Sequence, residues 1–262
     1  MSTEAFAHTR NALHHALQVA SALAATLRPG DDVHEAANLG WDPQLDALVG
    51  RRVGPRLDVA AGLRLRDATW LVIRDGEVLE ERKVVGSTLD GARSWLQGVV
   101  AYLGCEDREL VPPGYELPPH VAQEGQPLAD LDEGALAQLH DWFSLASTVL
   151  TGLRAQEPRA LPVRAWPHHF DLGTLIVLDR ESGRGIGIGM APGDARIRRP
   201  YLYVNPYPPP SEVDLPSLGR GRWHREAFFG AVFDPTEPSE AELSAFVGEA
   251  VAHCHTLLDG AP

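Results

Sequence analysis

The densest group of side chains that could do chemistry lies in the stretch Trp166-Pro-His-His-Phe-Asp-Leu172. On a β-strand successive side chains point to opposite faces, so His169 and Asp171 would share one face and His168 would point to the other. A histidine and a carboxylate on one face supply two ligands of a 2-His-1-carboxylate metal site, and His224 is the candidate for the third. The first hypothesis is therefore a divalent-metal centre at His169, Asp171 and His224 that supports hydrolysis or oxygen chemistry.

The same residues allow two other interpretations. In one, His169 acts as a metal-free general acid or base and Asp171 orients its ring. In the other, His169 donates to a backbone carbonyl or to Asp171 and only fixes the strand. We favour this structural interpretation, because a chain with eleven histidines gives a His-x-Asp pair by chance. Whether the protein is an enzyme stays open at this point.

A second group of candidates is aromatic. The stretch Pro200-Tyr-Leu-Tyr-Val-Asn-Pro-Tyr-Pro208 alternates strictly, which predicts a strand with Tyr201, Tyr203 and Asn205 on one face. Such a face can serve as a stacking platform for a carbohydrate or a peptide, although core packing is the alternative that we favour. With the neighbouring rings, the candidate ligand-binding residues are Trp166, His168, Tyr201, Tyr203, Asn205 and Trp223.

A glycine-rich stretch, Arg184-Gly-Ile-Gly-Ile-Gly-Met-Ala-Pro-Gly-Asp194, superficially suggests a phosphate-binding loop. A dinucleotide-binding fingerprint needs a strand before it and a helix that begins within it, and neither is predicted here. The alternation of glycine and isoleucine instead predicts a strand whose glycine face is closely approached by an aromatic ring or a ligand.

Charge and composition narrow the range of partners. The 262 residues carry a net charge of −13, and such a surface repels nucleic acid and anionic membranes. The chain contains no apolar run of the roughly 18 residues that a membrane span needs. Two cysteines, Cys105 and Cys254, are too few for a disulfide framework and indicate free thiols in a reducing compartment. We expect a cytoplasmic protein with a small-molecule ligand and no nucleic-acid or membrane partner, for which a homodimer is a compatible assembly.

Hydrophobic periodicity predicts four helices separated by β-rich segments. The i+3/i+4 spacing of an amphipathic helix is clear in the first, which carries Leu13, Leu17, Ala20, Leu23 and Leu27. The predicted helices cover residues 9–27, 88–103, 134–154 and 239–257. The pair Asp75-Gly76 between two β-rich runs predicts a tight hairpin. Residues 105–133 are rich in proline and acidic residues without periodicity, which is typical of a linker or long loop.

The two halves of the chain repeat the order helix, β-meander, helix. A shift of 126 residues aligns Leu13 with Leu139 and His14 with His140, and six of the sixteen positions 13–28 are then identical. We therefore expect an α+β fold of two similar helix–β-meander–helix halves, with a mostly antiparallel sheet backed by helices. The halves are predicted at 1–104 and 134–262, joined by the Pro-rich linker 105–133 in one globular unit.

Four segments together resemble the signature of a family of uncharacterised bacterial proteins that is known only as a domain of unknown function. They are Trp166-Pro-His-His-Phe-Asp-Leu, Ile-Gly-Ile-Gly-Met-Ala-Pro-Gly-Asp194, Pro200-Tyr-Leu-Tyr-Val-Asn-Pro-Tyr-Pro208, and Arg222-Trp-His224 with Phe229-Gly-Ala-Val. The resemblance covers residues from 160 to 235, and in the first half only the order of elements and the Asp-Gly turn agree. It implies no activity, cofactor or catalytic residue, but it indicates that these segments form one surface.

These observations lead to one expected function and two alternatives. We expect a bacterial protein with a small-molecule pocket in its C-terminal half, lined by His169, Asp171, Tyr201, Tyr203 and His224. The first alternative is a metal-dependent hydrolase or oxygenase that uses the His-x-Asp pair and the distant histidine. The second is a non-catalytic binding or structural protein.

Overall fold

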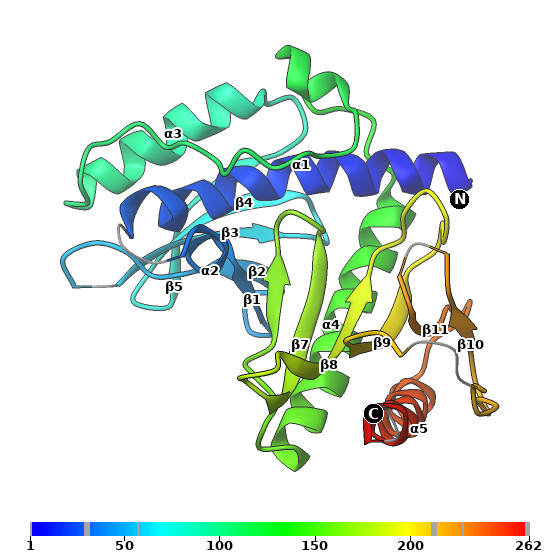
Figure 1. The fold of residues 1–262 in the computed structure, drawn as a ribbon. Coiled ribbons are helices and arrows are strands. Elements are labelled where there is room, and N and C mark those ends of the chain that lie inside the picture. Colours follow the sequence, from blue (N-terminus) through cyan, green and yellow to red (C-terminus); the bar gives the residue numbers. More distant parts are fainter. Residues whose placement is uncertain (1, 29–31, 57, 211–213, 227, 260–262) are drawn as a thin grey trace. The chain divides into compact units, whose positions relative to one another are not determined.

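The structure, a computed structural model, describes residues 2–28, 32–56, 58–210, 214–226 and 228–259. The chain forms two compact units (Figure 1). The first comprises Met1–Asp141 and Ala165–Phe170, and the second comprises Trp142–Arg164 and Asp171–Pro262. The expected α+β class is confirmed, because the described residues contain five α-helices and eleven strands that pair antiparallel.

The elements of the first unit are α1 (Thr3–Leu27), α2 (Val33–Ala37), β1 (Leu39–Asp42), β2 (Ala47–Gly50), β3 (Val59–Arg64), β4 (Thr69–Arg74), β5 (Glu77–Lys83), α3 (Leu89–Tyr102), the 3₁₀ helix η1 (Val121–Glu124) and, from Ala165 onward, β6 (Arg164–Trp166). The long helix α4 (Glu133–Gln156) begins in the first unit and continues in the second. The second unit also contains β7 (Asp171–Asp179), β8 (Arg184–Ala191), β9 (Tyr201–Tyr207), β10 (Arg222–His224), β11 (Gly230–Phe233) and α5 (Glu240–Asp259).

The strands of the first unit follow the order β6-β1-β2-β3-β4-β5. The predicted hairpin at Asp75-Gly76 joins β4 to β5, and both residues have the positive φ (54° and 91°) that a tight two-residue turn requires. The edge strand β5 is largely exposed and charged, which discourages pairing with another chain. Its last residue, Lys83, is the only lysine of the chain, and its Nζ donates to Asp67 Oδ2 at 2.7 Å and to Thr69 Oγ1 at 2.8 Å.

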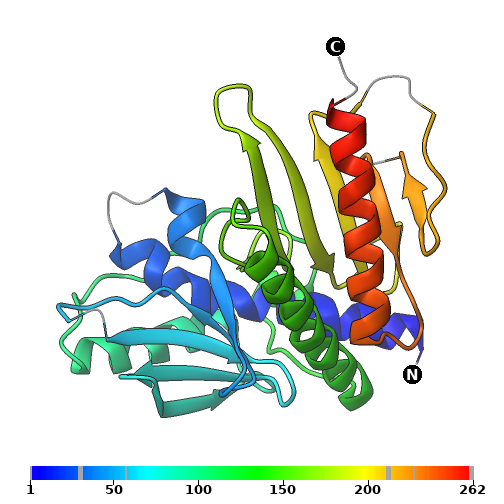
Figure 2. The ribbon, with the colours of Figure 1, turned by 90° about the horizontal axis from the view of Figure 1, so that it is seen from below.

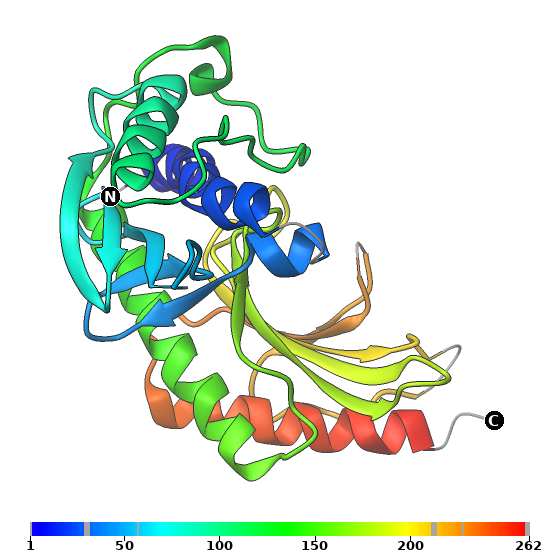
Figure 3. The same ribbon diagram turned by 90° about the vertical axis from the view of Figure 1, so that its left-hand side faces the viewer.

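Helix α1 is the centre of the first unit. Ser2 caps its beginning by accepting a hydrogen bond from the amide of Ala5. The sequence predicts an amphipathic helix with one exposed face. In the structure every residue from Ala12 to Ala24 is buried, so this stretch has no exposed face. The reason is that β2 and β3 pack on one side of it and α3 on another, while an irregular segment runs along it (Figure 3).

This irregular segment, residues 105–132, is the strap. It runs antiparallel to α1, as the green trace above the helix shows (Figure 1). Its amide of Val111 donates to Thr26 Oγ1 at 3.0 Å, and its amide of Asp132 donates to Thr9 Oγ1 at 2.9 Å. The predicted linker at 105–133 is therefore part of the first unit, and the predicted halves 1–104 and 134–262 do not match the two units of the structure.

Histidines complete the attachment of the strap to α1. His15 Nε2 lies 2.8 Å from the carbonyl oxygen of Pro118, and His8 Nε2 lies 3.1 Å from that of Ala129. The ring of His120, on the strap, lies between those of His8 and His15, with centroids 5.4 Å from each. Burial lowers the pKa of both His15 and His120, which favours the neutral form of these two imidazoles at neutral pH.

In the second unit the strands follow the order β10-β11-β9-β8-β7. Ile186, Ile188 and Met190 of β8 are completely buried on the face that α5 covers (Figures 2 and 3). The intervening glycines of β8 point to the opposite face, as the alternation in the sequence predicts. None of the helices among the described residues has the length and apolar character that crossing a membrane requires.

Candidate functional site

Residues 167–170 form a turn between β6 and β7, not a strand. The amides of His169 and Phe170 both donate to the carbonyl oxygen of Trp166, at 3.1 and 2.8 Å, and Phe170 has a positive φ of 55°. The prediction that His169 and Asp171 share one face of a strand is therefore wrong, because side chains do not alternate through a turn.

Buried polar side chains of α1 hold this turn in place. His14 Nε2 and Gln18 Nε2 both donate to the carbonyl oxygen of Pro167, each at 2.8 Å. The His14 ring also stacks on the ring of Phe170, with centroids 5.5 Å apart. Burial lowers the pKa of His14 to about 4, and electrostatic interactions with His15, Arg10 and His169 lower it further. The turn is thus held by a buried histidine of α1 that is neutral at neutral pH.

The turn places its histidines against two segments of the first unit that are far from it in the sequence. His168, His34 of α2 and Tyr115 of the strap are in mutual contact: their ring centroids are 5.4 Å apart for His34–His168, 5.2 Å for Tyr115–His168 and 5.5 Å for His34–Tyr115. Trp166 and His169 extend this group, with centroids 6.1 and 4.2 Å from that of His168. We call these five side chains the ring cluster.

The ring cluster is partly open to solvent. His34 and His169 are exposed, whereas Tyr115, Trp166 and His168 are half-buried. Burial lowers the pKa of His168 to about 4, and the neighbouring His169 and His34 contribute. Its Nδ1 is buried and has no hydrogen-bond partner among the described residues.

The Tyr115 hydroxyl group of the cluster lies near His34 and is affected by the charge of Asp32. Tyr115 Oη lies 3.3 Å from His34 Nδ1. Burial raises the pKa of Tyr115, and the negative charge of Asp32 raises it further. The cluster therefore presents a neutral phenol and a neutral imidazole beside a carboxylate.

In the second unit, Asp171 and Tyr203 form a pair on the glycine face. Tyr203 Oη donates to Asp171 Oδ2 at 2.6 Å. Its ring crosses the strand β8: a Cβ added at Gly189 would lie 2.4 Å from Tyr203 Oη, and one at Gly173 would lie 3.0 Å from it. Of the two occupants that the sequence allowed for this face, an aromatic ring or a ligand, the ring is present.

Tyr201 and Asn205 of β9 are also engaged by the protein itself. Tyr201 is buried beside Ile197 and Val232, and its hydroxyl donates to Asp194 Oδ2 at 3.0 Å. The Asn205 side chain lies over Gly187, where an added Cβ would meet Asn205 Oδ1 at 2.6 Å. These contacts favour core packing over a stacking platform.

The remaining predicted residues, Trp223 and His224, both lie on β10. Trp223 Nε1 donates to the carbonyl oxygen of Pro216 at 2.8 Å, and its ring stacks on Phe229. The His224 ring contacts that of Phe228, with centroids 4.8 Å apart. Both residues therefore pack within the second unit.

The described residues include no group of three or more histidine, cysteine, aspartate or glutamate side chains that could hold a metal ion. His169, Asp171 and His224 all belong to the described part of the chain. With the strand geometry of the His-x-Asp pair also wrong, the structure gives the metal hypothesis no ligand set.

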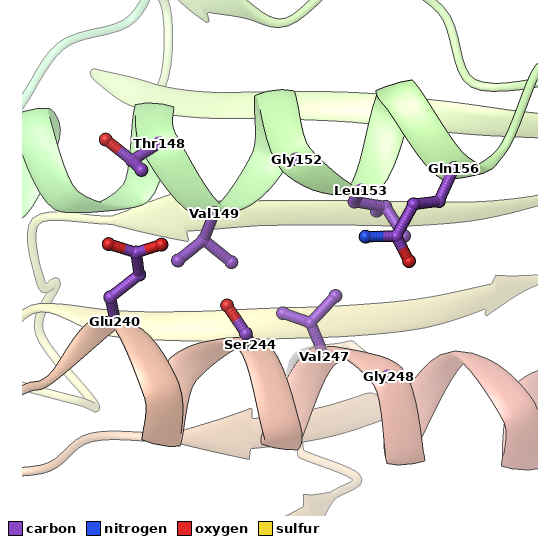
Figure 4. Close-up of a pocket in the computed structure, with 9 residues that line it drawn as sticks. All are labelled: Thr148, Val149, Gly152, Leu153, Gln156, Glu240, Ser244, Val247 and Gly248. Carbon is purple, nitrogen blue, oxygen red and sulfur yellow. The ribbon is translucent and has the colours of Figure 1, made fainter.

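A cavity of about 240 Å³ lies between α4 and α5 in the second unit (Figure 4). Its lining consists of Thr148, Val149, Gly152, Leu153 and Gln156 from α4 and Glu240, Ser244, Val247 and Gly248 from α5. Val149 and Val247 point into the gap from the two helices, and Glu240 is the one charged residue among the described residues that line it. None of the predicted ligand-binding residues lines this cavity.

Part of the ring cluster is visible in the sequence, and the rest is not. Trp166, His168 and His169 are in the stretch that attracts attention first. His34 and Tyr115 do not stand out, because they lie 134 and 53 residues before His168 in segments with no motif. A pattern within one short stretch contains no signal for such contacts.

Comparison with known proteins gives no match: neither a family model, nor a curated protein, nor a solved structure resembles this chain significantly.

Proposed function

We propose that this chain is a binding protein for a planar, nitrogen-containing small molecule, and that the ring cluster of the first unit is its site. The observation that carries the proposal is the mutual contact of His34, Tyr115 and His168, at centroid distances of 5.2–5.5 Å, from three segments far apart in the sequence. Aromatic rings gathered in a half-buried surface favour a ligand that stacks.

The charges beside the cluster favour a neutral or cationic ligand. Asp32 raises the pKa of Tyr115, so a carboxylate acts on this site, and an anionic ligand would be repelled by it. A neutral imidazole offers one acceptor and one donor, and His168 stays neutral down to a pH of about 4. A planar base with an N–H group matches both features.

The low pKa of His168 supports binding over catalysis. A general base is most effective when its pKa lies near the working pH, and a pKa of about 4 leaves the ring a weak base at neutral pH. The metal-dependent alternative lacks a ligand set among the described residues. We therefore prefer a non-catalytic role at this site.

Three probes that share the indole ring and differ in charge test this proposal: tryptamine, indole and indole-3-acetate. We expect affinity to fall in that order, measured by the chemical shifts of the protein's aromatic side chains. Tyr115→Ala should weaken tryptamine binding about two- to tenfold, because a stacked ring contributes roughly 0.5–1.5 kcal/mol. His168→Ala should weaken it similarly.

The matched control is Tyr102→Ala. Tyr102 of α3 is also in the first unit but is 90% exposed, so its removal should leave tryptamine binding unchanged. If no probe binds, or if Tyr115→Ala and His168→Ala bind tryptamine as well as the wild type, the ring cluster is a packing feature of the strap.

We further infer that the protein acts in the bacterial cytoplasm. The bacterial source rests on the sequence signature of residues 160–235 alone, because no family model matches the chain. Cys105 and Cys254 are both free and buried, which supports a reducing compartment.

A further inference from the structure

Two arginines converge on one carboxylate in the second unit. Arg199 precedes β9, Asp234 follows β11 and Arg222 begins β10. Pairing of Leu202 with Phe233 and of Arg222 with Val232 brings these strand ends together. Arg222 Nη1 donates to Asp234 Oδ1 at 2.6 Å, and Arg199 Nη2 lies 3.7 Å from Asp234 Oδ2.

The backbone around these arginines is held by hydrogen bonds. Asp194 Oδ1 accepts from the amides of Arg196 and Ile197, at 2.7 and 2.8 Å, and so fixes the loop that leads to Arg199. Arg199 Nη1 donates to Thr236 Oγ1 at 2.7 Å.

A glycine positions the other arginine. Gly221, with a positive φ of 76°, lies so close to β11 that an added Cβ would be 2.3 Å from the carbonyl oxygen of Val232. The chain immediately before Arg222 is therefore packed tightly against its neighbouring strand.

Within the described part of the chain, the contacts of the two guanidinium groups leave most of their N–H donors for another partner. Each has five N–H groups, and the contacts given above use only a few of them. Both side chains are half exposed, at 52% for Arg199 and 51% for Arg222, whereas Asp234 between them is 23% exposed. Asp234 thus holds the two groups near each other and neutralises only one of the two charges.

Further arginines surround this pair in the sequence. Arg196 and Arg198 lie just before Arg199, and Arg220 lies just before Arg222. All three are exposed, and within the described residues none of them forms an ion pair. Five arginines therefore occur in two short stretches next to the starts of β9 and β10, in a chain whose net charge is −13.

We propose that Arg199 and Arg222 form a binding site for the phosphate group of a small phosphorylated molecule. Guanidinium groups bind phosphate through paired N–H···O bonds. Two guanidinium groups held next to each other can therefore bind one phosphate group together. Charges separated by more than about 8 Å are screened at physiological salt, so a small anion responds to the local arginines. An extended polyanion such as nucleic acid would also meet the acidic remainder of the surface.

Titration calorimetry with inorganic pyrophosphate tests the site on the full chain. We expect binding that weakens at least tenfold in Arg199→Ala/Arg222→Ala. Arg199→Lys/Arg222→Lys keeps the charge and loses the paired geometry, so it should bind with intermediate affinity. Arg180→Ala, at an exposed arginine in the turn between β7 and β8, is the control and should bind as the wild type does.

Three results would overturn the proposal. One is the absence of pyrophosphate binding to the wild type, and another is unchanged binding in the double alanine variant with its circular dichroism spectrum intact. The third is tighter binding of a short DNA duplex than of pyrophosphate, since this would indicate a nucleic-acid surface.

Discussion

At the scale of single residues, burial decides the charge state of the histidines around α1. His14 donates to the carbonyl oxygen of Pro167, and its pKa of about 4 means that the folded protein holds it neutral where an exposed histidine would be partly charged. The stability of the fold is therefore linked to pH through this side chain.

The sign of this linkage follows from which state binds the proton. Between the ordinary pKa of 6.5 and the folded-state pKa of about 4, the unfolded chain is protonated at His14 and the folded chain is not. The stability associated with neutral His14 is fully present above pH 6.5 and is lost as the pH falls toward 4. The loss amounts to about 3 kcal/mol.

Urea unfolding of wild type and His14→Asn at about pH 7 and about pH 4.5 measures this effect. We expect the free energy of unfolding of the wild type to fall by about 2–3 kcal/mol more than that of the variant. Gln18→Ala is a matched control: it removes the other donor to Pro167 without a titrating group, and should lower stability equally at both pH values. An identical pH slope for wild type and His14→Asn would refute the linkage.

Residues 166–172 illustrate which features of single residues can be predicted from the sequence and which cannot. The sequence correctly singles out residues 166–172, because two histidines, two aromatic rings and an aspartate in seven positions are unusual. It wrongly predicts that a strand continues through residues 167–170. These residues form a turn that contains Pro167 and the positive φ of Phe170, and an alternating pattern does not reveal such a turn. The ring contacts with His34 and Tyr115 depend on how the strap folds back, which no local pattern encodes.

At the scale of elements, the strand β8 shows a local rule that works. Its alternation of glycine and isoleucine predicts one buried apolar face and one closely approached face, and both are present. The identity of the approaching group could not be predicted, since Tyr203 reaches Gly189 only through the register of β8 with β9.

Gly189→Ala tests how tightly this face is packed. The new Cβ would lie 2.4 Å from Tyr203 Oη and 2.7 Å from the carbonyl oxygen of Leu172, so one of them must move. We expect a loss of about 2 kcal/mol or more in the free energy of unfolding. Gly98→Ala is the control, because a Cβ on this glycine of α3 meets nothing within 4 Å and should stabilise the helix by about 0.5–1 kcal/mol. Equal effects at the two positions would contradict the packing.

The strap is the element that sequence reasoning describes least well. Proline-rich, acidic and without periodicity, residues 105–132 have every mark of a linker. Their attachment to α1 depends on single contacts such as His15 with Pro118, which are 103 residues apart. Each such contact uses an ordinary residue, so only the folded chain reveals them.

At the scale of the whole chain, the α+β class and antiparallel pairing follow from helix periodicity and the hairpin signals of the sequence. The division into units does not, because α4 contributes to both and residues 165–170 join the first unit. Internal duplication of the two halves stays a prediction. The proposed sites lie in different units, so each can be altered without changing the residues of the other.

Lys83 allows selective chemical modification of the chain at one lysine side chain. Because no other lysine occurs in the sequence, acylation of lysine side chains can modify only the end of the edge strand β5. Its amine donates to Asp67 and Thr69, and an amine held in this way should react slowly. We expect Asp67→Asn to accelerate acylation of Lys83, measured by mass spectrometry, and Glu80→Gln on the same strand to leave the rate unchanged. The acylation rate of Lys83 would then report whether β5 is paired in its sheet. A fluorophore attached to Lys83 would mark one known position in the first unit.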